Sequence, residues 1–362
     1  MDAPARTAGD PVVEEPVVEG IDRGPVTDWL TANIAGAVPP FRFELIAGGR
    51  SNLTYRVTDA GGRDYALRRP PVSHVLATAH DMAREHRIIS ALAPTSVPVP
   101  AALGLCVDES VTGAPFYVMD FVDGHILRSP DLVEASFPLP ARALIGPRLA
   151  ETLAGLHALD VEEIGLGDLA KREGYVARQL RRWGGQFEQM SEPGDRNAPA
   201  IRSIAAALTE RIPEQQTSGI VHGDFRLDNC VLDDAGRPVA ILDWELCTLG
   251  DPLADLAVLL VYWTEPGDTV VALEGQSPTL APGFSTRADL VAAYAAASPL
   301  ALDELDFYVA FAYWRLACIL QGVHFRYQAG ASAGDDSSVD DFPSHIEGLA
   351  AAAAGALEAL CR

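Results

Sequence analysis

The sequence predicts an α+β fold with a β-rich first part and a mainly helical second part. Residues 41–68 alternate apolar and polar side chains between glycine turns, which is typical of an antiparallel sheet. From Ala141 onward, apolar residues recur at helical spacing instead. Within the helical part, residues 220–242 hold three short apolar strands. A chain of 362 residues can hold two domains or one unit of two lobes.

Composition favours a globular protein with a sizeable core, because 48% of the residues are hydrophobic. No apolar run reaches the roughly 18 residues that a membrane helix needs, so we expect no membrane partner. The N-terminus lacks the basic start and apolar core of a signal peptide, which predicts a cytoplasmic location. The five cysteines form no CxxC pair and are expected to be reduced.

The formal net charge of −23 argues against nucleic acid as a partner, since phosphate binding needs a basic surface. The charge is compatible with a cationic substrate. It is also compatible with an acidic surface that serves solubility alone, and the solubility interpretation is favoured.

The first 22 residues are acidic and rich in proline, and we predict a disordered tail there. A short helix is expected over residues 25–35. In the sheet that follows, Gly48–Asn52 is predicted to form a tight turn between two strands. A glycine turn over a sheet lets backbone N–H groups approach a polyphosphate, so this turn is a candidate phosphate-binding loop.

Arg68 is the candidate phosphate-binding cation. Strand alternation places it on the same face as Ala66, as in the Val-Ala-Ile-Lys strand of protein kinases. Arginine replaces the usual lysine, which keeps the charge but enlarges the head group. If the register were shifted by one residue, Arg69 would take this role from the opposite face.

Glu85 is the expected partner of Arg68. It lies on the apolar face of a helix predicted over residues 78–93, where an unpaired carboxylate would be costly. Kinases use such an ion pair to place their phosphate-binding cation. The alternative is that Glu85 reaches solvent or pairs locally with Arg84 or Arg87.

The helical part offers two further candidates. His157 lies on an apolar helix face and is interpreted as a core histidine rather than a catalytic base. On a helix predicted within residues 172–190, Arg178 and Arg182 are four residues apart and Trp183 lies beside them. This basic, aromatic face could bind an anionic substrate group, or it could be a solvated surface.

The strongest signal is the group Asp224, Asn229 and Asp243. Asp224 precedes Asn229 by five residues, as in the catalytic loop of protein kinases, where the Asp receives the acceptor proton and the Asn binds metal. Two strands joined by a turn at residues 233–236 bring Asn229 and Asp243 together, and their oxygens suit Mg²⁺. Arg226 falls near the transferring phosphate.

The segments HGDFRLDN, ILDWE and GDPLAD resemble the aminoglycoside phosphotransferase and choline kinase-like family, over residues 24–330. The resemblance is greatest to the branch whose animal members carry the kinase-like domain fused to an acyl-CoA dehydrogenase. It implies a two-lobed protein-kinase-like fold that uses ATP and Mg²⁺. The implied parts are an N-lobe (23–119), a hinge (120–124) and a C-lobe (125–362).

The resemblance also implies roles for single residues. The nucleotide loop would include Gly49, Ser51 and Asn52, and the hinge backbone at Asp120 and Val122 would meet adenine. Asp255 would hold the backbone of the catalytic loop. A helix over residues 310–326, which contains Arg315, would close the acceptor cleft.

The function implied is an ATP-dependent phosphotransferase that acts on a hydroxyl group of a small-molecule alcohol. The resemblance points to a hydroxyacyl-CoA or hydroxy acid, and an aminoglycoside is the other acceptor considered. A pseudokinase or nucleotide-binding regulatory protein is the alternative, motivated by arginine at position 68. The intact Asp224, Asn229 and Asp243 argue against it. The sequence makes no prediction of oligomeric state.

Overall fold

The computed structural model describes residues 18–47, 52–72, 81–192, 194–270, 277–328 and 342–360. By its contacts the chain divides into two compact units. The first comprises Met1–His86 and Ala102–Phe121, and the second Arg87–Ala101 and Val122–Arg362. The first unit is built on an antiparallel sheet and the second is mainly helical, so the predicted α+β class is confirmed.

The first unit is organised on a five-stranded sheet in the order β1-β2-β3-β5-β4, with every neighbouring pair antiparallel. The strands are β1 (Arg42–Ala47), β2 (Leu53–Thr58), β3 (Asp64–Arg69), β4 (Ala102–Cys106) and β5 (Phe116–Asp120). Helix α1 (Arg23–Asn33) contributes Val26 and Leu30 to the core that this sheet forms. The antiparallel sheet predicted from alternation is therefore confirmed.

Helix α2 (Met82–Leu92) begins where Asp81 accepts a hydrogen bond from the backbone N–H of Arg84 at 2.9 Å. Its apolar face is buried at Met82, Ile88, Ile89 and Leu92, as helical spacing predicts. The expected helix was three to four residues longer at its start, but residues 78–80 lie outside the described part of the chain.

Residues 87–101 belong to the second unit, although the sequence placed them in the N-lobe. Two contacts explain this. The carbonyl oxygen of Pro98 accepts from the N–H of Ile241 at 2.8 Å, and Arg87 pairs with Asp168. The division between the units also falls between Phe121 and Val122, and a hinge over residues 120–124 stays a prediction.

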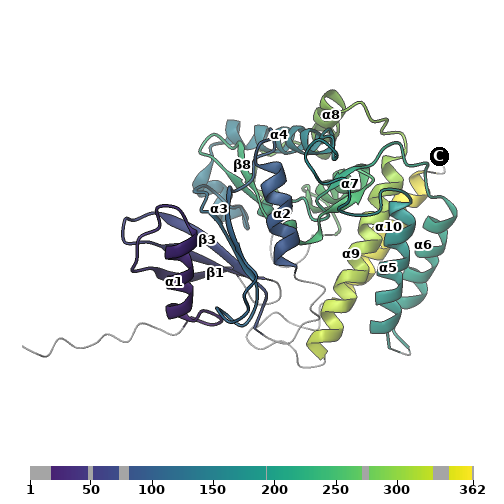
Figure 1. Ribbon diagram of the computed structural model, residues 1–362. Coiled ribbons are helices and arrows are strands. Elements are labelled where there is room, and N and C mark those ends of the chain that lie inside the picture. The colour runs from purple at the N-terminus through teal and green to yellow at the C-terminus, as the bar shows by residue number, and fades with distance from the viewer. Residues whose placement is uncertain are drawn as a thin grey trace, which may run out of the picture. The chain divides into compact units, whose positions relative to one another are not determined.

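The second unit is built around α9, the longest described helix. Its helices are α3 (Pro130–Ser136), α4 (Leu139–His157), α5 (Tyr175–Met190), α6 (Ala198–Glu210), α7 (Leu253–Tyr262), α8 (Arg287–Ala297), α9 (Leu305–Gln328) and α10 (Phe342–Ala359). Helix α9 packs against α5, α7 and α10 (Figure 1). Helix α7 is apolar on almost every side and is buried from Leu253 to Val261, as expected of a core helix.

Two short ladders precede α7. Strand β6 (Gly219–Val221) pairs with β9 (Thr248–Gly250), and β7 (Cys230–Leu232) pairs with β8 (Pro238–Ile241). The hairpin of β7 and β8 was predicted, whereas β9 was not. Gly250 packs directly on α5, because a Cβ there would lie 2.2 Å from the ring of Tyr175.

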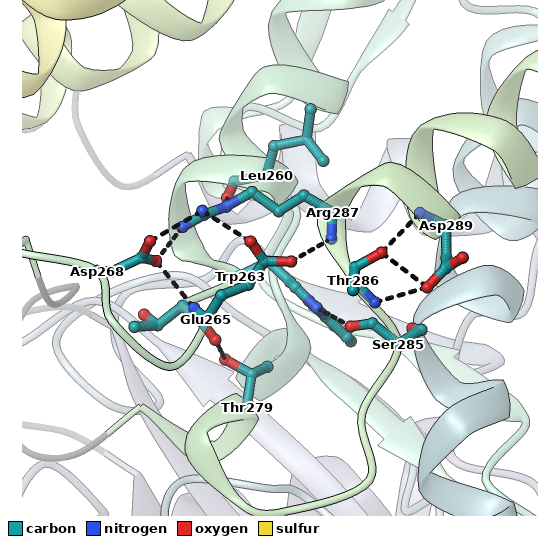
Figure 2. A network of polar contacts seen from close by, with 10 residues as sticks. Leu260, Trp263, Glu265, Asp268, Thr279, Ser285, Thr286, Arg287 and Asp289 are labelled. Atoms are coloured by element: carbon teal, nitrogen blue, oxygen red, sulfur yellow. Dashed lines mark hydrogen bonds and ion pairs between the residues drawn. The ribbon is translucent and has the colours of Figure 1, made fainter.

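A polar network fixes the chain after α7 (Figure 2). The indole N–H of Trp263 donates to the carbonyl oxygen of Ser285 at 2.9 Å, and Arg287 bonds to Asp268 at 3.1 Å. Thr286 caps α8 through a capping box with Asp289. These bonds tie the C-terminal end of α7 to α8.

None of the helices in the described ranges is long and apolar enough to cross a membrane. Residues 1–17 of the predicted tail and the loop residues Gly49 and Ser51 lie outside the described residues. The prediction of disorder up to residue 22 is wrong at its end, because Ile21 is buried in the core of the first unit.

Candidate active site

The loop that follows β6 takes its shape from Asp255 on α7. This fully buried carboxylate accepts hydrogen bonds from the backbone N–H groups of His222 and of Gly223, the latter at 2.8 Å. Gly223 has a φ of 88°, and a Cβ there would lie 2.9 Å from the carbonyl oxygen of Leu246. Glycine is therefore required at this position. The helix α7 thus determines where the next residue, Asp224, is placed.

His222 joins the same loop to the end of β8. Its Nδ1 accepts from the backbone N–H of Asp224 at 3.2 Å, so its Nε2 carries the proton and donates to the carbonyl oxygen of Leu242 at 2.9 Å. The ring is completely buried against Trp244. No role was predicted for His222, although it is the first residue of the HGDFRLDN segment.

Asp224 is oriented by two side chains. The amide nitrogen of Asn229 donates to the carbonyl oxygen of Asp224 at 2.9 Å and to its Oδ2 at 3.0 Å. The Nε of Arg226 donates to the same Oδ2 at 3.2 Å. The other carboxylate oxygen, Oδ1, accepts no hydrogen bond from a described residue. A hydroxyl group could therefore donate to Oδ1 without displacing a protein contact.

Asp243 and Asn229 lie on adjacent chain segments, because the N–H of Leu242 donates to the carbonyl oxygen of Asn229 at 2.8 Å. Asp243 has a φ of 65° and is the only residue other than glycine with a positive φ in the described ranges. Such left-handed positions are strained and cluster at functional sites. Since the amide nitrogen of Asn229 is already engaged, its amide oxygen and the carboxylate of Asp243 form a donor set that fits Mg²⁺.

Arg226 lies in a cluster of charges. It pairs with Asp224 and with Asp228, each at 3.2 Å, and its guanidinium lies 4.9 Å from the ring centroid of Tyr262. Burial lowers the pKa of Arg226, but the neighbouring carboxylates outweigh burial and raise it. Burial raises the pKa of Asp228, and Arg226 opposes that shift. The sequence analysis missed both Asp228 and Tyr262, because neither belongs to the kinase-like spacing.

In the first unit, Arg68 forms an ion pair with Glu85, with Nε and Oε2 3.0 Å apart. Glu85 is almost completely buried and also accepts from Asn52 at 2.8 Å and from the hydroxyl of Tyr117 at 3.0 Å. Arg69 instead bonds to the carbonyl oxygens of Gly20 and Thr112. The partner of Glu85 is therefore Arg68 and not Arg69, and a phosphate-binding role for Arg68 stays a prediction.

The remaining residues predicted to contact the nucleotide are Asn52, Asp120 and Val122. Asn52 lies buried against Glu85 rather than in an open loop. Asp120 ends β5 and accepts from Arg63 at 2.7 Å, and Val122 is half-buried. Contacts of Asp120 and Val122 with adenine stay a prediction.

Two predicted candidates of the second unit have structural contacts. His157 is buried, bonds to the hydroxyl of Tyr294 at 2.7 Å and lies 3.5 Å from Asp255, so it supports the base of the catalytic loop. Arg178 donates to the carbonyl oxygens of Lys171 and Glu173.

The chain was compared with known proteins. The model of the phosphotransferase enzyme family (APH) matches residues 42–305. A mouse protein, acyl-CoA dehydrogenase family member 10, is 34% identical over 290 residues, which cover 79% of this chain and 26% of that protein. Human acyl-CoA dehydrogenase family member 11 is 33% identical over 293 residues, which cover 80% of this chain and 37% of that protein. The chain therefore spans well under half the length of these relatives.

Solved structures show the same fold. A provisionally assigned aminoglycoside phosphotransferase of Ralstonia eutropha has a TM-score of 0.75 at 30% identity, covering 92% of this chain and 98% of that one. The GDP complex of aminoglycoside 2′-phosphotransferase-IIIa has a TM-score of 0.62 at 16% identity, covering 92% and 99%. The second likeness concerns the fold alone.

Proposed function

Because the chain belongs to the phosphotransferase enzyme family, we propose that it transfers the γ-phosphoryl group of ATP to a hydroxyl group of a small molecule, with Mg²⁺ as cofactor. One observation carries this proposal. Asp224 has one carboxylate oxygen held by Asn229 and Arg226, while its other oxygen accepts no hydrogen bond within the described part of the chain. This arrangement suits a general base that meets an incoming hydroxyl.

The proposed step balances as follows. The acceptor O–H gives its proton to Oδ1 of Asp224, and its oxygen forms a bond to the γ-phosphorus. The bond between that phosphorus and the β,γ-bridging oxygen breaks, and ADP leaves with the electron pair. His222 and Asp255 keep the loop rigid, so that Asp224 does not need to reorganise during the step.

Asn229 and Asp243 would hold the cofactor through their side-chain oxygens. When bound, Mg²⁺ neutralises charge on the β- and γ-phosphates. In the first unit, Arg68 would supply a positive charge to the phosphates, and Glu85 fixes its position. The nucleotide complexes of structural relatives support a nucleotide substrate.

For the acceptor we propose a hydroxyacyl-CoA or a free hydroxy acid. The support is the similarity to proteins named as acyl-CoA dehydrogenase family members. An aminoglycoside is the second candidate, supported by the name of the Ralstonia relative. The competing class, a nucleotide-binding protein without phosphoryl transfer, is favoured by one observation only, the arginine in place of lysine at position 68.

A transfer assay with γ-labelled ATP tests the proposal. Hydroxyacyl-CoA compounds, their free acids and aminoglycosides are offered in parallel. We expect one of these classes to acquire label, and Asp224→Asn to reduce turnover by about 10²-fold or more while calorimetry shows unchanged binding of Mg-ATP. Turnover of Asp224→Asn equal to wild type would refute the base assignment. Tight Mg-ATP binding without transfer to any class would favour the competing, non-catalytic reading.

A further inference from the structure

A small cavity lies directly beside Asp224 in the second unit. Its volume is about 20 Å³, roughly the space of one water molecule. It is lined by the catalytic loop and by helices α7 and α9, through Gly223, Asp224, Val258, Val261, Tyr262, Ala312, Arg315, Leu316 and Ile319. Apart from the loop, the lining is apolar except for Tyr262 and Arg315. A ligand that reaches Asp224 here therefore meets an apolar wall and one guanidinium.

Arg315 is buried in this wall with an incomplete set of partners. It is 7% exposed, and its Nη2 donates to the carbonyl oxygen of Gly223 at 2.6 Å. Its Nε is buried and has no hydrogen-bond partner in the described part of the chain. No carboxylate of a described residue forms an ion pair with it within 4.0 Å. A buried guanidinium without a counter-charge is costly, which points to an anion supplied from outside.

The guanidinium of Arg182 lies near the ring of Trp183, as does that of Arg315. The ring centroid is 5.3 Å from Cζ of Arg315 and 5.1 Å from Cζ of Arg182. Trp183 is fixed in turn, because its indole N–H donates to the side chain of Gln179 at 2.9 Å. Partial burial lowers the pKa of Arg182, and the positive charge of Arg315 lowers it further.

Arg182 also lacks an acidic partner among the described residues. Arg178, one turn earlier, shows the contrast, since it is occupied by two backbone carbonyl oxygens. Arg182 is itself exposed, as is the neighbouring Arg181.

We propose that Arg182, Trp183 and Arg315 form an oxyanion-binding subsite for the acceptor alcohol. The acceptor then carries a carboxylate or a phosphate that meets the guanidinium groups, and a hydroxyl group at Asp224. Arg315 has a double role, because it binds the anion and also holds the carbonyl oxygen of Gly223. The inference rests on the proposed function and specifies its substrate class as an anionic alcohol.

The first experiment measures binding without turnover. The probes are 3-hydroxyhexanoate and its uncharged amide, each added in the absence of ATP, and the readout is the shift in melting temperature together with calorimetry. We expect the carboxylate to bind at least about tenfold more tightly than the amide, because hydrogen bonds to charged groups are stronger than those to neutral groups. This preference should be lost in Arg182→Gln.

Arg181→Gln is the matched control. It removes the same charge from the adjacent position of α5, so a general electrostatic effect would appear equally in both variants. The proposal is wrong if wild type binds the acid and the amide equally and also shows no preference between the CoA and pantetheine thioesters described next. It is also wrong if Arg181→Gln loses the preference as fully as Arg182→Gln does.

A second pair of probes identifies the source of the anion. 3-Hydroxyhexanoyl-CoA is compared with the 3-hydroxyhexanoyl thioester of pantetheine, which lacks the phosphates. A preference for the CoA compound that depends on Arg182 assigns the subsite to a carrier phosphate, whereas a preference confined to the free acid assigns it to a carboxylate. In Arg315→Lys the charge is kept but the planar fork is lost, so we expect weaker anion binding and a changed kcat as well as KM. Urea unfolding checks that this variant is folded.

Failure of this inference and failure of the proposed function give different results. If labelled phosphate is transferred to anionic alcohols with the same kcat/KM in wild type and Arg182→Gln, the kinase assignment stands and the subsite does not. If no alcohol is phosphorylated but anion binding depends on Arg182, the subsite stands and the reaction must be a different one.

Discussion

Asp255 holds Gly223 from a neighbouring helix, since its Oδ1 accepts the backbone N–H of Gly223 at 2.8 Å inside the core. Its second oxygen accepts the N–H of His222. One carboxylate therefore satisfies two successive backbone donors that have no strand partner at this point. The catalytic loop depends on α7 for its conformation.

Replacing Asp255 by alanine should lower the free energy of unfolding by about 3 kcal/mol, because two buried N–H groups lose a charged acceptor. Asp255→Asn keeps one acceptor oxygen, and we expect a smaller loss. Urea unfolding followed by circular dichroism measures both. A loss below about 0.5 kcal/mol in the alanine variant would contradict the role given to this residue.

Asp243 has a strained backbone and is proposed to bind Mg²⁺, and two replacements separate these two properties. Asp243→Ala and Asp243→Gly both remove the carboxylate, so both should lose the Mg²⁺ dependence of nucleotide binding. Only glycine adopts a φ of 65° at no steric cost, so the glycine variant should be more stable than the alanine variant by about 1 kcal/mol. Thermal unfolding and calorimetry with Mg-ATP and with ATP plus chelator provide the two readouts. Equal stability of the two variants would show that the left-handed backbone carries no strain.

The Arg68–Glu85 pair can be tested by a double-mutant cycle. Arg68→Met removes the guanidinium that pairs with buried Glu85, and we expect a loss of about 3 kcal/mol in the free energy of unfolding. Glu85→Gln combined with Arg68→Met should cost less than the two single losses added together, because no charge is then left unpaired. Additive losses would mean that the pair contributes no coupling. Nucleotide affinity, measured on the same variants, shows separately whether Arg68 contacts phosphate.

Asp251 should make stability depend on pH. Burial raises its pKa above the ordinary value of 3.8, although the Tyr308 hydroxyl, which donates at 2.6 Å, opposes the shift. A raised pKa in the folded state means that the charged form is disfavoured there, so at pH 7 the charge costs stability. As pH falls through the raised pKa, this cost disappears.

Asp251→Asn should therefore be more stable than wild type at pH 7, and the difference should vanish as the pH approaches about 3.8. Urea unfolding at a series of pH values measures it. A variant that is less stable than wild type at pH 7 would show that the hydrogen bonds of the carboxylate outweigh its burial.

The sequence predicted those parts of the molecule in which local periodicity and burial agree. Alternation gave the strands around Arg68, and the partner of Arg68 followed from Glu85 lying on an apolar helix face. Strand β9 was missed because Thr248–Gly250 is short and pairs with a strand nearly thirty residues earlier. Local periodicity contains no information on such pairing.

The contacts around Asp224 were predicted only in part for the same reason. The five-residue spacing to Asn229 is local, and it places the two side chains in contact. Arg315 reaches Gly223 from a helix more than ninety residues later, and Tyr262 reaches Arg226 from another. These are tertiary contacts, and a single sequence shows only that an arginine occurs within an apolar helix.

The backbone around Asp224 is held at Gly223 from both sides, by the α7 carboxylate at its N–H and by the α9 guanidinium at its carbonyl oxygen. Both hydrogen bonds are made by buried side chains of the helical unit, Asp255 and Arg315. Heat inactivation should therefore coincide with cooperative melting of that unit, and a partly frayed yet globally folded enzyme that has lost its loop should never accumulate.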